Sequence, residues 1–332
     1  MRNPYNNNNL KSKIQNLKLF ILREIRLVWN WPAGLLARLR RVAPERLLLV
    51  VLALVALGLW WGAARLLPRP LEVTALSVGD GDAYLIRAPS GGCVLLDGGS
   101  RSQAYVGEEV LVPNLLQLGV RRLDALIISH PDADHVNGLP DVLGALPVAR
   151  VLDPEQPDDG TAYQQVVAIC KEKAIPRFPV RAGQQIDLDR RTRLRILAPG
   201  PRLLSGTASD TNNNSLVCRL EFGRTRMLFT GDLQAEGEAQ LLGRTGDLRA
   251  DVLTAAHHGS RNGTGTALLD AVRPQIVVIS GQGGEEHPHA DTLRRLRDRG
   301  VVILRTDVHG RIRLRSDGTT WRVATFRNAA GR

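Results

Sequence analysis

The sequence predicts a mixed α/β fold in which helices cover the outer faces of β-sheets, preceded by a single transmembrane helix. Three observations lead to this prediction. Residues 47–64 form an uncharged apolar run, strands and helices alternate after it, and polar residues gather where several strands end. The 332 residues are enough for a large domain beside a membrane segment. We therefore expect a basic arm over 1–46, a transmembrane helix over 47–66 and one domain over 71–326.

The transmembrane prediction rests on the apolar run. Eighteen uncharged residues are about what an α-helix needs to cross the hydrocarbon core of a bilayer. Arg46 and Arg65 bracket the run, and Trp60 and Trp61 lie near one end, where interfacial aromatic residues are common. A cleaved signal peptide fits less well, because 46 residues precede the run. A helix in a soluble core would carry a polar face, which this run lacks.

The formal net charge of +11 is concentrated before the domain. Residues 1–46 hold ten Lys and Arg against two acidic residues, whereas the residues after 70 hold 32 basic and 31 acidic groups. The overall charge of the domain therefore does not indicate nucleic-acid binding. An excess of basic residues before the run predicts a cytoplasmic arm, a single pass through the cytoplasmic (inner) membrane and an extracytoplasmic domain. Membrane lipid is then the partner of residues 47–66.

Beyond Pro70 the apolar patterns predict the elements of the domain in order. Strands are expected at 71–78, 83–88, 93–96, 123–129, 193–197, 216–221, 227–230, 251–256, 275–280, 301–304 and 311–314. Helices are expected at 110–118, 139–146, 162–173, 233–242, 265–272 and 291–299. The three cysteines are odd in number and widely spaced, so they predict neither a disulfide framework nor a cysteine zinc motif.

Four residues that can bind a metal follow the strand at 123–129 directly. His130, Asp132, Asp134 and His135 fall within six positions. Four buried polar groups in so short a loop would be costly without a partner, and a divalent cation satisfies them together. Imidazole and carboxylate groups suit zinc, manganese or iron. A solvated acidic turn is the alternative interpretation.

Other polar residues follow other strands. Asp97, Asp232, His257, His258 and His287 each come after a predicted strand, and no histidine lies between positions 135 and 257. Residues at strand ends on a rigid sheet are well suited to holding a metal. Taken singly, Asp97 could equally be a turn residue. The joint pattern indicates one site along an edge of the sheets.

These motifs, in this order, resemble the metallo-β-lactamase superfamily. They are most similar to the extracytoplasmic C-terminal domain of ComEC-type competence proteins, which take part in DNA uptake. The matching segments are Val78-Gly-Asp-Gly-Asp-Ala83, Leu96-Asp-Gly-Gly99, Ser129-His-Pro-Asp-Ala-Asp-His135, Asn212-Asn-Asn-Ser215, Thr230-Gly-Asp232, His257-His-Gly-Ser260 and His287-Pro288. The resemblance implies an αββα sandwich with a metal site along one edge.

The resemblance also implies a role for each residue. The expected metal ligands are His130, Asp132, Asp134, His135, Asp232, His258 and His287, with Asp232 as a bridge between two ions. The residues expected to act in catalysis are Asp134, His257 and His258, and whether His257, His258 or His287 completes the metal site stays open. The residues expected to orient the ligands from behind are Asp80, Asp82, Asp97, Asn212, Asn214, Ser215 and Ser260.

Two departures from the superfamily pattern affect the metal. Asp132 stands where the superfamily usually has histidine, and the histidine of its usual third motif is missing. Domains of the ComEC type resemble this chain in both respects. A carboxylate in place of an imidazole makes the site harder, so we expect one or two divalent ions, zinc or manganese, with magnesium also compatible.

The function expected from these features is that of a membrane-anchored, metal-dependent hydrolase, a phosphodiesterase or nuclease related to DNA uptake. DNA and a separate channel protein are the expected partners, because ComEC-type proteins carry many membrane helices and this chain has one apolar run. Arginine clusters at 190–195, 294–299 and 311–315 could follow a phosphate backbone or be solvated faces. The alternatives are a hydrolase of another ester, such as a phospholipid headgroup, a cell-wall phosphoester or a lactone, and a non-catalytic subunit of a membrane complex.

Overall fold

The computed structural model describes residues 15–16, 19–20, 44–66 and 69–327. It divides into two compact units, Met1–Pro68 and Arg69–Arg332. The first contains the helix α3 (Pro44–Leu66). Among the described residues, no helix is both long enough and apolar enough to cross a membrane, so the transmembrane helix predicted over 47–66 is not supported. Most of the predicted arm over 1–46 lies outside the described residues.

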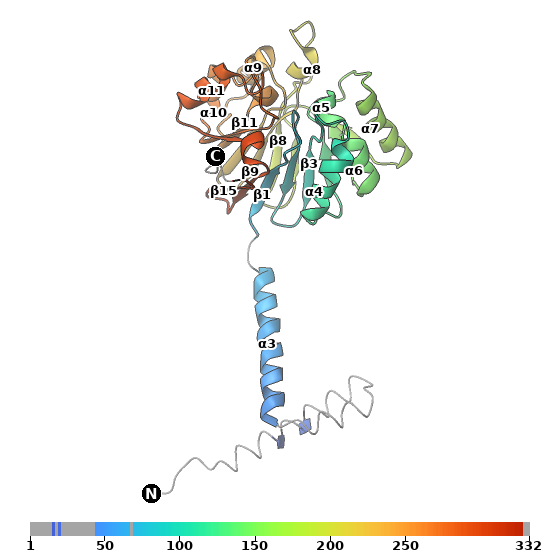
Figure 1. Cartoon of the computed structure of the whole chain (residues 1–332), viewed down its shortest axis with the longest axis vertical. Coiled ribbons are helices and arrows are strands. Elements are labelled where there is room, and N and C mark those ends of the chain that lie inside the picture. Colours follow the sequence, from blue (N-terminus) through green and yellow to red (C-terminus); the bar gives the residue numbers. More distant parts are fainter. Residues whose placement is uncertain (1–14, 17–18, 21–43, 67–68, 328–332) are drawn as a thin grey trace. The chain divides into compact units, whose positions relative to one another are not determined.

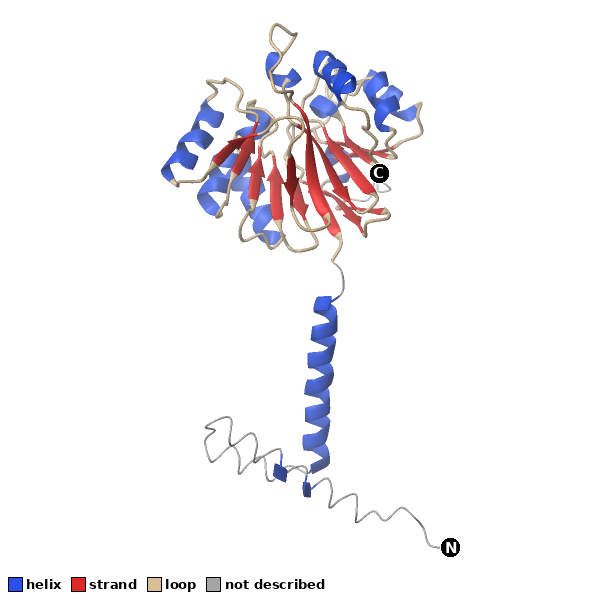
Figure 2. Cartoon of the chain, turned by 180° about the vertical axis from the view of Figure 1, so that it is seen from behind, coloured by secondary structure: helices blue, strands red, loops and turns tan. Residues whose placement is uncertain are grey.

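The second unit is built on two β-sheets that pack face to face (Figures 1 and 2). Across the eight-stranded sheet the order is β15 (Trp321–Thr325), β14 (Ile312–Ser316), β1 (Leu71–Ala75), β2 (Tyr84–Arg87), β3 (Cys93–Leu96), β4 (Ala125–Ile127), β5 (Val151–Asp153) and β6 (Arg177–Pro179). Across the seven-stranded sheet it is β13 (Val302–Arg305), β12 (Ile276–Ile279), β11 (Val252–Thr254), β10 (Thr225–Phe229), β9 (Val217–Phe222), β8 (Thr192–Ala198) and β7 (Gln185–Asp187).

Helices cover the outer face of each sheet (Figure 1). The first sheet is covered by η1 (Gly107–Leu111), α4 (Val112–Gln117), α6 (Leu139–Ala145) and α7 (Thr161–Glu172), and the second by α9 (Ala235–Arg244), α10 (Thr266–Val272) and α11 (Ala290–Arg297). Four short helices lie in connections: α5 (Ala133–Val136), α8 (Asp210–Asn213), η2 (Ala256–Gly259) and α12 (Thr306–His309). The predicted mixed α/β fold with helix-covered sheets is confirmed.

The strand β3 shows why such sheets need apolar residues on both faces. Val94 and Leu96 belong to the core between the two sheets, while Cys93 and Leu95 pack against the helices. All four side chains are buried, as expected for a strand with a layer on each side. The side chains of the strand alternate between the two faces, so the run CVLL fills both cores.

The direction of the strands places the site. β3, β4 and β5 are parallel neighbours, and so are β10, β11 and β12. The carboxyl ends of these strands lead into the segments that contain Asp97, His130, Asp232, His257 and His287. β1 runs antiparallel to β2, which runs antiparallel to β3, so the turn that follows β1 lies at the same edge. The fold thus brings the polar segments to one edge of the sandwich.

Candidate metal centre

The first group of side chains comes from the connection between β4 and α5. His130 and His135 are fully buried, and Asp134 is almost so. Asp132 is the residue before the first turn of α5, and its side chain is about one-third exposed, with Oδ2 3.6 Å from His130 Nε2. Asp134 and His135 are consecutive residues of α5, which is a single helical turn, and both are buried.

The Asp232 carboxylate stands at the centre of the cluster. Its Oδ1 lies 3.1 Å from His135 Nε2 and 3.8 Å from His258 Nε2. Its Oδ2 lies 3.7 Å from His130 Nε2 and 3.7 Å from His257 Nε2. Donor atoms of Asp134, His135, Asp232 and His258 all lie within 4.8 Å of one another. Residues from three separate connections, those after β4, β10 and β11, therefore face one point.

Unpaired polar atoms test whether this cluster suits a cation. The buried atoms His130 Nε2, His135 Nε2, His258 Nε2 and both carboxylate oxygens of Asp232 make no hydrogen bond of ordinary geometry in the described structure, although His135 Nε2 and Asp232 Oδ1 lie 3.1 Å apart. Buried polar atoms are nearly always paired, because leaving one unpaired costs about 1–3 kcal/mol. Five such atoms around one point fit a divalent ion, and imidazole with carboxylate is a donor set for zinc, manganese or iron.

The electrostatics of the cluster agree with this fit. Burial opposes ionisation of Asp232, but the neighbouring His135 and His258 outweigh it and hold the pKa of Asp232 well below its usual range. Burial likewise works to lower the pKa of His135, and the carboxylates of Asp232 and Asp97 raise it well above its usual value instead. The carboxylates therefore favour positive charge at this point, which a bound metal ion would supply.

Asp97 and Ser129 together orient two histidines of the cluster. Its Oδ2 lies 3.1 Å from His135 Nδ1, and its Oδ1 accepts a hydrogen bond of 2.7 Å from Ser129 N–H. Ser129 Oγ lies 2.9 Å from His130 Nδ1. Both imidazoles are thus held through Nδ1, which leaves Nε2 directed at the centre. Metal-binding histidines are commonly oriented in this way by a carboxylate.

His257 and His258 occupy a strained turn. Both have positive φ, 50° and 53°, within η2. Such conformations cost non-glycine residues of order 1–3 kcal/mol and are concentrated at functional sites. The turn directs His258 into the interior, where Nδ1 lies 3.2 Å from the Ser280 carbonyl oxygen. His257 is partly exposed, and the Gln234 amide donates to its Nδ1 over 3.1 Å.

The turn after β1, a strand of the eight-stranded sheet, also reaches the cluster. Asp82 is buried, with Oδ1 3.6 Å from His258 Nδ1, and it accepts a long hydrogen bond from Tyr84 Oη. Asp80 Oδ1 lies 3.7 Å from Nδ1 of His287. The His287 ring is 5.1 Å from the His257 ring between centroids, so His287 belongs to the cluster, with its closest carboxylate on Asp80.

In the segment 212–215, one residue supports the cluster from behind and another bonds elsewhere. Ser215 Oγ accepts a hydrogen bond of 3.1 Å from Asp232 N–H, and so holds the backbone of the central carboxylate. The Asn214 amide bonds instead to the backbone of Leu204 and Asp210, and the Asn212 carbonyl accepts from Ser215 N–H. Ser260 Oγ is buried and has no partner among the described residues.

Two side chains that the sequence analysis did not single out reach the cluster. Arg101 Nη2 lies 2.7 Å from Asp134 Oδ2, and Gln234 holds His257 as described above. Neither has a sequence signal of its own: each is one polar residue in a loop. His289 and His309 are occupied elsewhere, since His289 Nδ1 accepts from Asp291 N–H and His309 Nδ1 lies against the Arg305 backbone.

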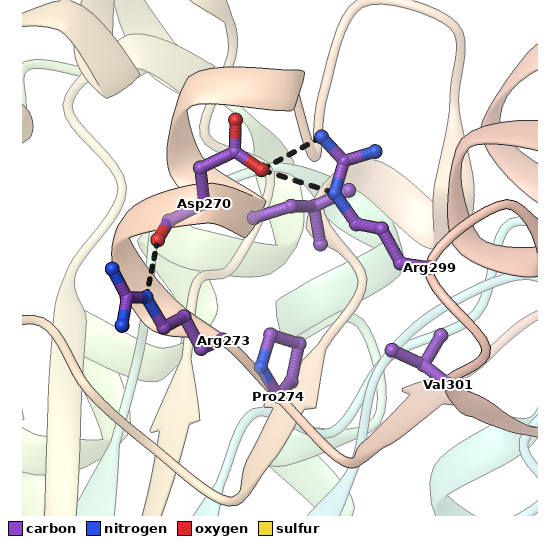
Figure 3. Close-up of a pocket in the computed structure, with 6 residues that line it drawn as sticks. Asp270, Arg273, Pro274, Arg299 and Val301 are labelled. Atoms are coloured by element: carbon purple, nitrogen blue, oxygen red, sulfur yellow. Dashed lines mark hydrogen bonds and ion pairs between the residues drawn. The ribbon is translucent and has the colours of Figure 1, made fainter.

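A separate pocket of about 410 Å³ lies beside α10 and β13 (Figure 3). Its polar groups are already paired with one another. Arg299 Nη2 lies 2.8 Å from Asp270 Oδ1, and Arg273 Nε donates to the Asp270 carbonyl oxygen. None of the predicted site residues lines it. We therefore assign the chemistry to the histidine cluster.

The sequence profile of the metallo-beta-lactamase superfamily matches residues 76–283. The chain belongs to this superfamily, whose members are generally metal-dependent hydrolases. The predicted resemblance is confirmed.

Among similar proteins, ComE operon protein 3 of Bacillus subtilis (strain 168) is 31% identical over 270 residues, 77% of this chain and 34% of that protein. Competence protein ComA of Neisseria gonorrhoeae is 32% identical over 241 residues, 72% of this chain and 31% of that protein. The chain thus spans about a third of the length of these relatives. The crystal structure of CmlA, a diiron beta-hydroxylase from Streptomyces venezuelae, shares the fold, with a TM-score of 0.50 at 17% identity over 75% of this chain and 54% of that one.

Proposed function

We propose that this chain is a metal-dependent phosphodiesterase that cleaves DNA. The single observation that carries the proposal is the set of five unpaired buried donor atoms on His130, His135, His258 and Asp232. The carboxylate-rich character of the site, with Asp132 and Asp134 beside the histidines, favours a hard ion and a phosphate substrate. The name of one relative, Competence protein ComA, supports choosing DNA as the polymer.

We assign the metal-holding role to His130, His135, His258, Asp134 and Asp232, with Asp132 and His287 at the margins of the site. A bound divalent ion would polarise the phosphoryl oxygen and make a water molecule more acidic. Asp97 and Ser129 orient the imidazoles behind it.

His257 fits a different task from His258. It is partly exposed, and burial lowers its pKa, which favours the neutral imidazole. Because Nδ1 accepts from Gln234, the ring proton sits on Nε2, on the side of Asp232. From there His257 can donate a hydrogen bond to an oxygen on which negative charge builds up. His258, fully buried, holds its position beside Asp82 and Asp134.

The test uses the purified full chain, loaded with manganese or zinc and shown to be folded. Single-stranded DNA, double-stranded DNA and bis(p-nitrophenyl) phosphate are supplied as substrates. We expect cleavage that His258→Ala abolishes and that His309→Ala leaves unchanged, since His309 Nδ1 bonds to the Arg305 backbone and not to a side chain of the cluster. A folded, metal-loaded chain that cleaves none of these phosphodiesters contradicts the proposal. A lactone and a carboxylic ester are supplied in parallel, and activity confined to these two supports the alternative hydrolase.

We also propose that the chain is held at the cytoplasmic membrane through α3, with the hydrolase domain outside the cytoplasm and a separate channel protein as partner. In support, eight large apolar side chains between Leu49 and Trp60 are exposed on this helix. Exposed apolar surface of this extent calls for an apolar partner. Alkaline carbonate washing of membranes is the test: the full chain should stay in the pellet, and its complete release contradicts anchoring.

A further inference from the structure

Arg101 brings a cation to a cluster otherwise made of acids and imidazoles. Its Nη2 lies 2.7 Å from Oδ2 of the buried Asp134. Among the described residues, no other arginine or lysine pairs with Asp80, Asp82, Asp97, Asp132, Asp134 or Asp232. The Arg101 side chain is 53% exposed, whereas that of Asp134 is 2% exposed. The guanidinium therefore spans from the interior of the site to its mouth.

The loop that carries Arg101 is held rigidly. The Asn137 amide accepts from Ser100 N–H over 2.8 Å and donates to the Ser100 carbonyl oxygen over 2.7 Å. Arg101 N–H itself donates to the Asp80 carbonyl oxygen over 2.6 Å. At Gly99 an added Cβ would lie only 2.5–2.6 Å from backbone atoms of α5, so the loop and α5 are in direct contact. A side chain on such a loop is positioned before any ligand arrives.

Much of the guanidinium is still free to bind. Arginine carries five N–H donors, and only Nη2 of Arg101 makes a hydrogen bond to the described part of the chain. The planar group matches the oxygens of a phosphate and binds them in pairs. The surrounding carboxylates would repel an anionic substrate, so a fixed cation at the mouth counters that repulsion.

We infer that Arg101 binds the non-bridging oxygens of the substrate phosphodiester and orients it in the metal site. This inference rests on the proposed function. Asp134 serves as the fixed support for the guanidinium, and the free N–H groups face the substrate. A purely structural salt bridge would instead stabilise Asp134 and leave the affinity for phosphate unchanged.

The test compares Arg101→Gln, Arg101→Lys and the matched control Arg122→Gln in the full, metal-loaded chain. Arg122 also pairs through Nη2 with an aspartate, Asp124, at 2.9 Å, but in an exposed ion pair away from the cluster. The readouts are KM for bis(p-nitrophenyl) phosphate, the inhibition constant of inorganic phosphate, and metal content.

Arg101→Gln is expected to raise KM and the phosphate inhibition constant about tenfold or more, the usual loss for a charged hydrogen bond. Arg101→Lys keeps part of the affinity, and Arg122→Gln matches the unchanged chain, with metal content constant throughout. Unchanged phosphate affinity in Arg101→Gln, or a loss of metal that accounts for the whole effect, overturns the inference. If the unchanged chain cleaves no phosphodiester, the proposed function fails, and direct calorimetry with inorganic phosphate still decides the role of Arg101 by the same comparison.

Discussion

Replacing Asp97 by Asn should weaken metal binding sharply while leaving the fold in place. The substitution keeps the acceptor for Ser129 N–H, which bonds to Oδ1 over 2.7 Å, so the local backbone is retained. It replaces the Oδ2 that lies 3.1 Å from His135 Nδ1 by an amide that donates. The imidazole must then accept at Nδ1 and carry its proton on Nε2, where the lone pair for a metal is needed.

The expected size of this effect follows from the contact that is lost. A buried hydrogen bond to a charged group contributes about 1.5–3 kcal/mol, and each 1.4 kcal/mol is about a tenfold change in affinity. We therefore expect zinc or manganese to bind about 10- to 100-fold more weakly, in line with the usual effect of removing such an orienting carboxylate.

Competition with a coloured chelator measures this affinity directly. The matched control is Asp153→Asn, which alters another buried aspartate that bonds Arg177 and Glu155 N–H and contacts no residue of the cluster. Circular dichroism checks that both variants are folded. A metal dissociation constant for Asp97→Asn within twofold of that of the unchanged chain would contradict the orienting role of Asp97.

Two further predictions concern stability. Burial raises the pKa of Glu238 to about 7, so between about pH 4.5 and 7 the folded chain keeps a proton that the unfolded chain has lost. The free energy of unfolding of the unchanged chain should therefore fall across this window relative to that of Glu238→Gln, by at most about 3 kcal/mol in urea titrations. A difference between the two chains that stays constant with pH would contradict this prediction. Gly99→Ala should lower the free energy of unfolding by at least about 1 kcal/mol and weaken metal binding, since its Cβ would press on the α5 backbone. Its control, Gly144→Ala, lies in open space within α6 and should raise the free energy of unfolding by about 0.5–1 kcal/mol. Equal melting temperatures for the two variants would contradict this prediction.

The sequence predicted the longer elements because their apolar patterns are strong. The helices α6, α7, α9 and α10 and the strand β3 lie within one or two residues of the expected bounds. β5, β6 and β7 were missed, since each has only three residues and too short a pattern to show a period. The edge strand β15 was missed as well, because its side chains are mostly exposed and give no alternation.

The candidate site was predictable for residue types that commonly bind metals. Histidines and acids at strand ends gave the cluster, but their contacts depend on tertiary packing. The Asn214 amide, expected near the ligands, is taken up by the backbone of its own loop. The role of Arg101 could not be predicted from the sequence, because its pairing with Asp134 depends on the tertiary fold.

The number of metal ions bound per chain shows whether the histidine cluster is a metal centre. The full chain is stripped with chelator, reloaded with zinc or manganese, and analysed by mass spectrometry for metal per chain beside a Asp232→Asn, His135→Ala double variant. We expect one or two tightly bound ions in the unchanged chain and none in the folded variant. An unchanged, folded chain that retains no divalent ion, or a variant that retains as much as the unchanged chain, would contradict it.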